Sequence, residues 1–345
     1  MIIAARFKPV PGRLTHVLKR VGGVSLALLL SLGLLSLGGC SALRLGYSQG
    51  PDLVYWYLDG YLDFNPAQTP KVREALTQWF AWHRRTQLPD YAAALVRAQA
   101  DVRGDVTPAR VCEWQGELLT RGRTAFDRFA PAAAEFIATE TPQQVEYLER
   151  RYAKANLKFA DDYLHHNPRK RAEAALRRTI DRLETLYGPL PSAQRAQLAE
   201  ALARSPFDAD AWFAERREQQ QEALNLLRRF GTGATAAVAA SATNVPPATG
   251  SSGADSAAAA DRTAATTQAA LRTYFAHMER SPREPYRRYA ARLREFNCEV
   301  AAQFHNATSA AQRQVAARKL AGWEADAREL ARAAPPGNGA PDAGR

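Results

Sequence analysis

Residues 141–164 read TPQQVEYLERRYAKANLKFADDYL, and this stretch decides the fold class. Its apolar side chains recur three or four residues apart, at Val145, Leu148, Tyr152, Ala155 and Phe159. At that spacing they share one face of a helix, whereas the residues of a half-buried strand would alternate every second position. The stretch therefore predicts an amphipathic helix that packs by one face.

The stretch opens with a hydroxyl residue followed by proline, and this pair recurs along the chain. A hydroxyl at the N-cap accepts an orphan amide, and proline at the first helical position needs no donor. Gln144 also stands where a capping-box side chain is expected. We therefore expect a helix to begin at each pair: Thr69-Pro70, Thr107-Pro108, Thr141-Pro142, Ser205-Pro206 and Ser281-Pro282.

The same periodicity over the rest of the chain indicates an all-α protein. Convincing alternation of apolar and polar residues is absent, and short connections favour antiparallel neighbours. We expect a multi-helix bundle or an irregular helical array. The predicted helices are 51–64, 69–86, 89–103, 107–129, 131–139, 141–164, 168–187, 191–204, 206–230, 262–280, 282–305 and 308–333.

One stretch, 231–261, interrupts this pattern. It consists almost wholly of Ala, Gly, Ser, Thr and Pro, and such a composition has too little apolar bulk to offset the entropy of ordering. We predict a disordered insertion within a single α-helical domain spanning 51–334, followed by a disordered tail at 335–345. A linker between two domains is the alternative, although the helical residues after it are few for an independent core.

The first 39 residues differ from all that follow. Five basic residues and no acidic one precede or flank an apolar run, Val24 to Leu37, which ends in Gly38-Gly39-Cys40. Fourteen helical residues span about 21 Å, short of the roughly 30 Å hydrocarbon core of a bilayer. We predict a signal peptide over 1–39, with a signal anchor and a chance cysteine as the alternative.

The sequence Leu37-Gly38-Gly39-Cys40 resembles the lipobox of bacterial lipoproteins. This resemblance implies cleavage before Cys40, lipid (diacylglycerol and palmitate-like acyl chains) on Cys40, and a lipidated tether over 40–50. Several acyl chains make a stable anchor. The next residue is Ser41 rather than Asp, which by the same resemblance implies the outer membrane of a Gram-negative bacterium, with the domain facing the periplasm.

The net charge indicates little about which partners the protein binds. The chain has 46 basic and 35 acidic residues, a net charge of +11. Five basic residues belong to the predicted signal, so the remainder carries 41 against 35, or +6. A mild excess favours contact with anionic envelope polymers or head groups. With no recognition motif, we expect no nucleic-acid partner.

Three cysteines are present. If Cys40 carries lipid, Cys112 and Cys298 remain as an even pair in an oxidising compartment. A bridge between them would close a long loop, for which the chain-entropy model gives about 4 to 5 kcal/mol. We predict this disulfide; the alternative is two separate buried thiols.

The densest cluster of aromatic and polar residues comprises Trp79, Trp82, His83, Arg84 and, beyond Leu88-Pro89, Tyr91. On a helix Trp79, Trp82 and His83 share a face. One interpretation is a binding surface, because aromatic rings beside cations can stack on sugars or grip anions. The other is a helix-hairpin corner, with the tryptophans in the core and His83 or Arg84 bonding carbonyls across the turn.

Residues 55–102 resemble the uncharacterised proteobacterial lipoprotein family DUF6279. The family pattern has an aromatic-rich opening, a glutamine before the first long helix, then Trp-His-Arg, Leu-Pro and Tyr. In this sequence the matching residues are Trp56, Asp59, Gln68, Trp82, His83, Arg84, Leu88, Pro89 and Tyr91. The resemblance implies a lipoprotein and implies no activity.

No motif for nucleophilic, phosphate-binding or zinc chemistry occurs. We predict no catalytic, cofactor or metal site. The function expected from the sequence is non-catalytic binding of an envelope protein or peptidoglycan, or a structural role. The alternatives are a peptidoglycan-directed enzyme or its activator, and a periplasmic holdase chaperone.

Overall fold

Every regular element in residues 42–164, 166–232 and 253–333, which the computed structural model describes, is an α-helix. The all-α prediction is therefore confirmed. The predicted signal 1–39, the residue Cys40, most of the insertion 231–261 and the tail 335–345 lie outside the described residues. The described residues form α2 (Ala42–Ser48), α3 (Gly50–Leu62), α4 (Gln68–Asp101), α5 (Pro108–Ile137), α6 (Pro142–Tyr163), α7 (Pro168–Tyr187), α8 (Ser192–Ala203), α9 (Ala209–Phe230), α11 (Gly253–Glu279), α12 (Glu284–Asn306) and α13 (Ala310–Arg332).

Two of the five hydroxyl–proline pairs are N-caps. The Thr107 side chain accepts the amide of Arg110, and Thr141 forms the expected capping box with Gln144. The other three expected N-caps are wrong by two or three residues. At α9, for example, Asp208 rather than Ser205 is the cap, because its carboxylate accepts two first-turn amides; a carboxylate at that end also meets the positive end of the helix dipole.

Two predicted helix breaks are absent. Pro89 lies inside α4 and Pro131 inside α5, where we had expected each helix to end. A proline in a helix leaves the carbonyl four residues earlier without its amide donor. Both prolines, and the residues that carry those carbonyls, Arg85 and Asp127, are exposed. Water can therefore satisfy the freed carbonyls, and both helices continue.

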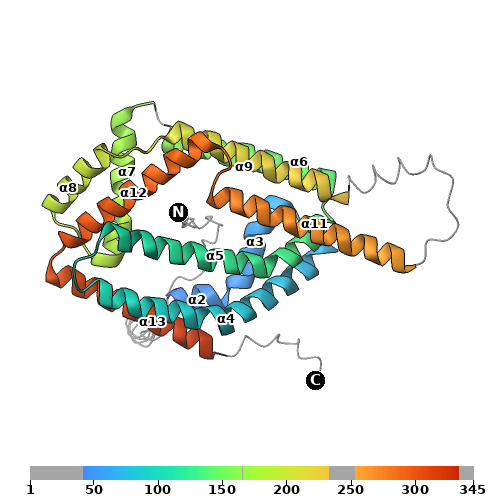
Figure 1. Cartoon of the computed structure of the whole chain (residues 1–345), viewed down its shortest axis with the longest axis horizontal. Coiled ribbons are helices and arrows are strands. Elements are labelled where there is room, and N and C mark those ends of the chain that lie inside the picture. The colour runs from blue at the N-terminus through green and yellow to red at the C-terminus, as the bar shows by residue number, and fades with distance from the viewer. Residues whose placement is uncertain (1–41, 165, 233–252, 334–345) are drawn as a thin grey trace, which may run out of the picture.

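The helices pack in two closed circuits that share α4 and α5. In the first circuit, α4 and α5 are joined through α11, α9, α6 and α3; in the second, through α12, α8, α7 and α13. Figure 1 shows α5 between the pair α4–α13 and the pair α11–α12. Helices that follow the segment 233–252 thus pack against helices that precede it.

Each circuit encloses apolar side chains of its own. The first buries Ile137, Leu148, Leu224 and Leu271, from four different helices. The second buries Val102, Tyr187, Ala316 and Leu320. A third cluster, built on Tyr55, Val72 and Leu76, fills the angle between α3, α4 and α5. Burial of each large side chain contributes about 1.5 to 3 kcal/mol, which makes these clusters the main stabilising term.

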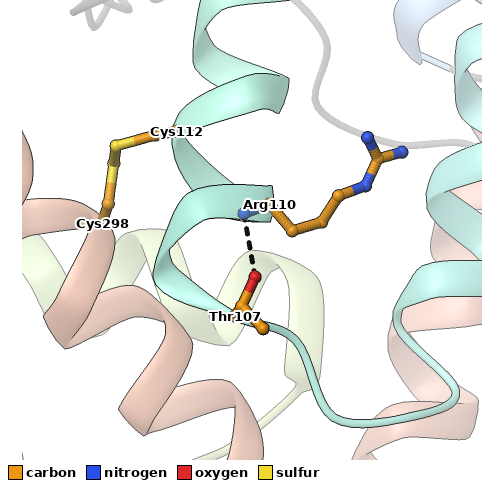
Figure 2. The surroundings of a disulfide bond; sticks show 4 residues. All are labelled: Thr107, Arg110, Cys112 and Cys298. Carbon is orange, nitrogen blue, oxygen red and sulfur yellow. Dashed lines mark hydrogen bonds between the residues drawn. A yellow bond between two sulfur atoms is a disulfide. The ribbon is translucent and has the colours of Figure 1, made fainter.

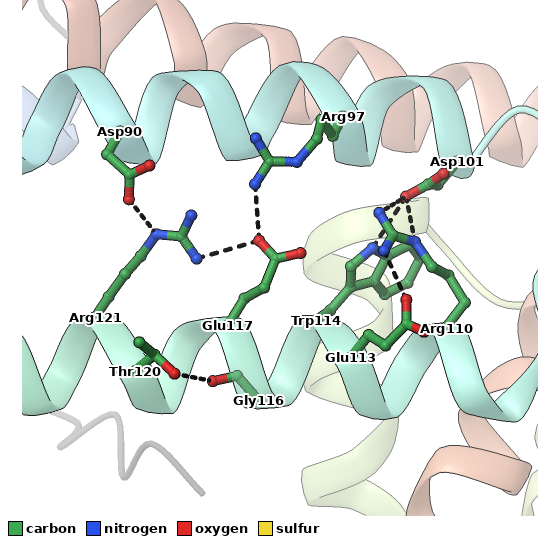
Figure 3. Close-up of polar contacts among 10 residues, drawn as sticks. All are labelled: Asp90, Arg97, Asp101, Arg110, Glu113, Trp114, Gly116, Glu117, Thr120 and Arg121. Atoms are coloured by element: carbon green, nitrogen blue, oxygen red, sulfur yellow. Dashed lines mark hydrogen bonds and ion pairs between the residues drawn. The ribbon is translucent and has the colours of Figure 1, made fainter.

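A row of charged residues joins α4 to α5 along their length (Figure 3). Arg121 contacts Asp90 at 2.7 Å and Glu117 at 3.2 Å, and Glu117 also accepts from Arg97 at 2.8 Å. Further along, Asp101 accepts from Arg110 and from the indole of Trp114. The two helices are therefore held in one register by groups of opposite charge.

The loop between α4 and α5 is held by the end of α12. The buried His305 ring bonds the Tyr187 hydroxyl at 2.9 Å and the Gly104 carbonyl at 2.8 Å. The neighbouring Asn306 side chain bonds both backbone groups of Val106. These bonds satisfy polar groups that would be costly to bury alone.

The predicted disulfide is confirmed. Cys112 of α5 and Cys298 of α12 are bonded, with their Cα atoms 5.6 Å apart and 186 positions apart in sequence (Figure 2). The bond therefore ties the part of the chain before the segment 233–252 to the part after it.

Replacing both Cys112 and Cys298 by alanine should lower the free energy of unfolding by about 2 to 5 kcal/mol, because the unfolded chain regains the freedom that the bridge removes. Thermal unfolding followed by circular dichroism measures this. A reductant should lower the midpoint of the native protein and leave that of the double variant unchanged; equal midpoints for both proteins without reductant would contradict the prediction.

Candidate functional site

The cluster singled out in the sequence lies in the middle of α4, not at a hairpin corner. Because α4 continues through Pro89, Trp79, Trp82, His83 and Tyr91 all lie on one helix. Their rings surround the imidazole: Trp79 stacks on His83 with centroids 4.9 Å apart, and Tyr91 lies 5.6 Å away. The corner interpretation is therefore wrong, and the cluster is a mid-helix aromatic face.

One end of this face is covered by α2, a helix that the sequence analysis had treated as tether. The hydroxyl of Tyr47 in α2 bonds Nδ1 of His83 at 2.9 Å. The Tyr47 ring meets Phe80 edge-on at 5.5 Å. Tertiary contacts of this kind stabilise a seven-residue helix that would not persist alone.

Burial keeps the two bonded groups neutral. It lowers the pKa of His83 to about 4 and raises the pKa of Tyr47 to about 12. At neutral pH the imidazole is therefore uncharged, and one hydrogen bond between neutral groups joins α2 to α4. A general acid or base would need a pKa near the working pH, so His83 is poorly tuned for that role.

Three arginines face the same rings. Arg84 is buried, and its guanidinium lies 5.4 Å from the Tyr47 ring centre. Arg121 lies 5.8 Å from Tyr91, and Arg128 lies 5.9 Å from Trp82. Cations over aromatic faces gain about 0.5 to 2 kcal/mol each. The aromatic and cationic groups that suggested a ligand surface are thus used, in large part, by Tyr47 and by α5.

The indole of Trp79 links the cluster to α5. Its Nε1 donates to the Ala125 carbonyl at 2.9 Å. This bond supports the part of the sequence interpretation in which a tryptophan of the cluster packs inside the protein. The aromatic cluster on α4 as a whole therefore holds α2 in place.

A second unusual group, Glu140, was missed by the sequence analysis. It lies between α5 and α6, is 2% exposed, and neither carboxylate oxygen has a hydrogen-bond partner among the described residues. Burial raises its pKa to about 8. Nothing in its local sequence, TETP, distinguishes it from a solvated loop glutamate, since Thr232, which contacts its backbone, lies 92 positions later in the chain.

The backbone of Glu140 fixes the end of α9. Its carbonyl accepts both the amide and the hydroxyl of Thr232 at 2.9 Å. At Gly231 a Cβ would lie 2.8 Å from the carbonyls of Glu140 and Leu227, so only glycine allows this approach. The chain therefore enters the segment 233–252 from a fixed point.

Gln68 and Gln144 form a buried amide pair. Gln144 donates to Gln68 at 2.8 Å and to the carbonyl of Asp63 at 3.0 Å, and Gln68 donates to Thr139. The starts of α4 and α6 are thereby joined to the end of α3. Gln68 was expected only as a helix-preceding glutamine, and its long-range partner has no local signal.

Groups of three or more His, Cys, Asp or Glu side chains placed to hold a metal ion are absent from the described part of the chain. None of the described helices is long and apolar enough to cross a bilayer.

These observations define a disulfide-bonded, all-α protein in which two helical circuits share one helix pair and a short N-terminal helix is clamped onto an aromatic face. The model of the family of unknown function DUF6279 matches residues 60–240. The chain belongs to that family, as its resemblance had indicated. Neither a curated protein nor a solved structure matches the chain.

Changing Tyr47 to phenylalanine should loosen α2, because it leaves the partly buried Nδ1 of His83 without a partner at a cost of about 1 kcal/mol. Hydrogen exchange of the amides of residues 43–49 should become faster. Tyr147→Phe is the matched control, since that hydroxyl has no hydrogen-bond partner among the described residues. Unchanged exchange in Tyr47→Phe would show that the bond does not hold α2.

Changing Glu140 to glutamine should stabilise the protein at high pH only. The unfolded carboxyl titrates near pH 4.5 and the folded one near 8. The folded state therefore binds the proton more tightly, and its stability falls as pH rises between these values. Each pKa unit corresponds to about 1.4 kcal/mol, and glutamine removes this loss.

Melting temperatures at pH 5 and pH 9 measure the effect. The gain of Glu140→Gln over the native protein should be larger at pH 9. The exposed Glu135→Gln in α5 is the control and should show no such difference. A gain that is the same at both pH values would refute the assignment.

Proposed function

We propose that this protein is a lipid-anchored, non-catalytic binding or structural protein of the bacterial cell envelope, with lipid on Cys40 and the helical body held close to the membrane. The outer membrane, with the body facing the periplasm, is the proposed location. The observation that carries the proposal is the clamping of α2, which begins at Ala42.

Two contacts hold α2 on the body. Tyr47 bonds His83 of α4, and Arg44 lies 3.1 Å from Asp326 of α13. The Asp326 side chain is 11% exposed, so this ion pair is largely shielded from water and stronger than a surface pair. A pull on the N-terminus would therefore be transmitted to two of the longest helices.

The distance from the proposed lipid to the clamp is short. Two residue steps separate Cys40 from Ala42, which allows at most about 7 Å. Next to this point α2 exposes Leu43 and Leu45, at 46% and 65% of their surface. Exposed leucines beside a lipid anchor suit the boundary between head groups and acyl chains. The short distance and the exposed leucines both support the proposal that the helical body lies directly on the membrane.

The titratable groups favour binding over catalysis. His83 is covered by Tyr47, and its pKa of about 4 is far from neutral. The carboxyl of Glu140 is enclosed, without access for a substrate. General acid–base catalysis needs reachable groups with a pKa near the working pH.

The anchor is tested by the intact mass of protein extracted from membranes. We expect a mass equal to Cys40–Arg345 plus acyl chains. A Cys40→Ala variant should lack the acyl chains and should retain residues 1–39, because cleavage before position 40 depends on the lipidated cysteine. A native mass that retains residues 1–39, or that lacks lipid, would contradict the proposal.

The non-catalytic part is tested by incubating the purified protein with sacculi. Binding without release of soluble muropeptides is the expected result or, if peptidoglycan is not the partner, neither binding nor release. Release of muropeptides would overturn this part and favour a peptidoglycan-directed enzyme.

A further inference from the structure

A cavity of about 530 Å³ opens between the end of α4 and the first half of α13. Its charged lining residues are Arg103, Arg313 and Arg318, and no carboxylate is among the residues that line it. A cavity of this volume suits a small molecule rather than a single ion. Three guanidinium groups around it make an anion the fitting occupant.

Arg313 is held in place before any ligand arrives. Its Nη2 contacts the Asp105 carboxylate at 2.6 Å and the Asn306 carbonyl at 3.1 Å, and its Nε lies 3.4 Å from the Thr308 hydroxyl. Nη1 has no hydrogen-bond partner in the described part of the chain. A guanidinium fixed on one side presents its remaining donors without a further loss of side-chain entropy.

The other two arginines are free to act on a ligand. Arg103 and Arg318 are exposed, and their side chains have neither an ion pair nor a hydrogen bond within the described ranges. Most other arginines beside α4 and α5 are paired, as in the row that contains Arg97, Arg110 and Arg121. The cavity is therefore lined by two guanidinium groups without a carboxylate partner, those of Arg103 and Arg318, and by that of Arg313, which is already held in position.

The rest of the lining fits an organic body attached to the anion. Ala310, Ala317 and Ala321 supply methyl groups, and Gln314 and Thr308 supply polar ones. Ala310 is also the first residue of a 23-residue helix, whose N-terminal amides and dipole favour negative charge. The surface thus combines an apolar floor with a cationic rim.

We propose that this cavity binds a phosphate ester, with the phosphate on Arg103, Arg313 and Arg318 and the organic part on the alanines. A phosphate monoester carries about −1.5 to −2 charge at pH 7, which matches several guanidinium groups better than a single carboxylate does. The ester can be a soluble metabolite or the head group of an envelope lipid. The proposal does not depend on the anchor at Cys40.

The test is calorimetric titration of the full-length protein in detergent with glucose 6-phosphate, with glucuronate and glucose as the carboxylate and neutral probes. We expect glucose 6-phosphate to bind with a Kd of about 1 mM or lower and the other two to bind at least about tenfold more weakly. Arg103→Gln/Arg318→Gln should weaken phosphate binding by about tenfold or more without changing the melting temperature, since neither side chain is paired.

The matched control is Arg204→Gln/Arg262→Gln, which removes the same charge from the C-cap of α8 and from α11 and should leave binding intact. Displacement of glucose 6-phosphate by micelles with phosphatidic acid, whose head group is a phosphate monoester, but not by micelles with phosphatidylcholine, would assign the lipid source; no displacement would assign a soluble ester. The proposal is overturned if glucose 6-phosphate does not bind, if glucuronate binds equally well, or if the control variant loses affinity as much as the cavity variant.

Discussion

The contact between α4 and α5 is the constraint on which the rest of the architecture depends, because both helical circuits close through it. Exposed ion pairs contribute only about 0 to 1 kcal/mol each, so the row from Asp90 to Trp114 sets register more than stability. Stability comes from the apolar clusters on either side. If the pair slid by one helical turn, α3 and α13 would both lose the surfaces against which they pack.

Helix content, helix faces and the disulfide could be predicted from the sequence because they depend on local spacing or on simple counting. The face of α6 carries Val145, Leu148 and Phe159 as the period requires, and all three are buried. The continuation of α4 through Pro89 and of α5 through Pro131 could not be predicted, since a proline is tolerated where the freed carbonyl faces water, and that orientation is a tertiary property. Likewise α11 begins at Gly253, nine residues before the expected start, and α2 forms where only a tether was expected.

In the candidate site, too, some residues could be found from the sequence and others could not. The residues Trp79, Trp82, His83, Arg84 and Tyr91 were found from their density on one stretch. Their partners were not: Tyr47 lies 36 positions from His83, and Gln144 lies 76 positions from Gln68. Glu140 carries no local sign of burial, and the arginines of the cavity come from the turn after α4 and from α13, which are distant in sequence. Long-range pairing decides which polar residues are used inside the protein.

In the proposed export of the chain, the disulfide has a consequence for how the chain matures. Cys112 emerges first and can find Cys298 only after nearly all of the helices have been delivered, because the partner lies 186 positions later. Until then the α5 thiol stays exposed to oxidants and to other proteins. With the thiol of Cys40 committed to lipid in the proposed anchor, however, a single intramolecular pairing is available. Maturation would then require an oxidant but no isomerase, since there is no wrong bridge within the chain to correct.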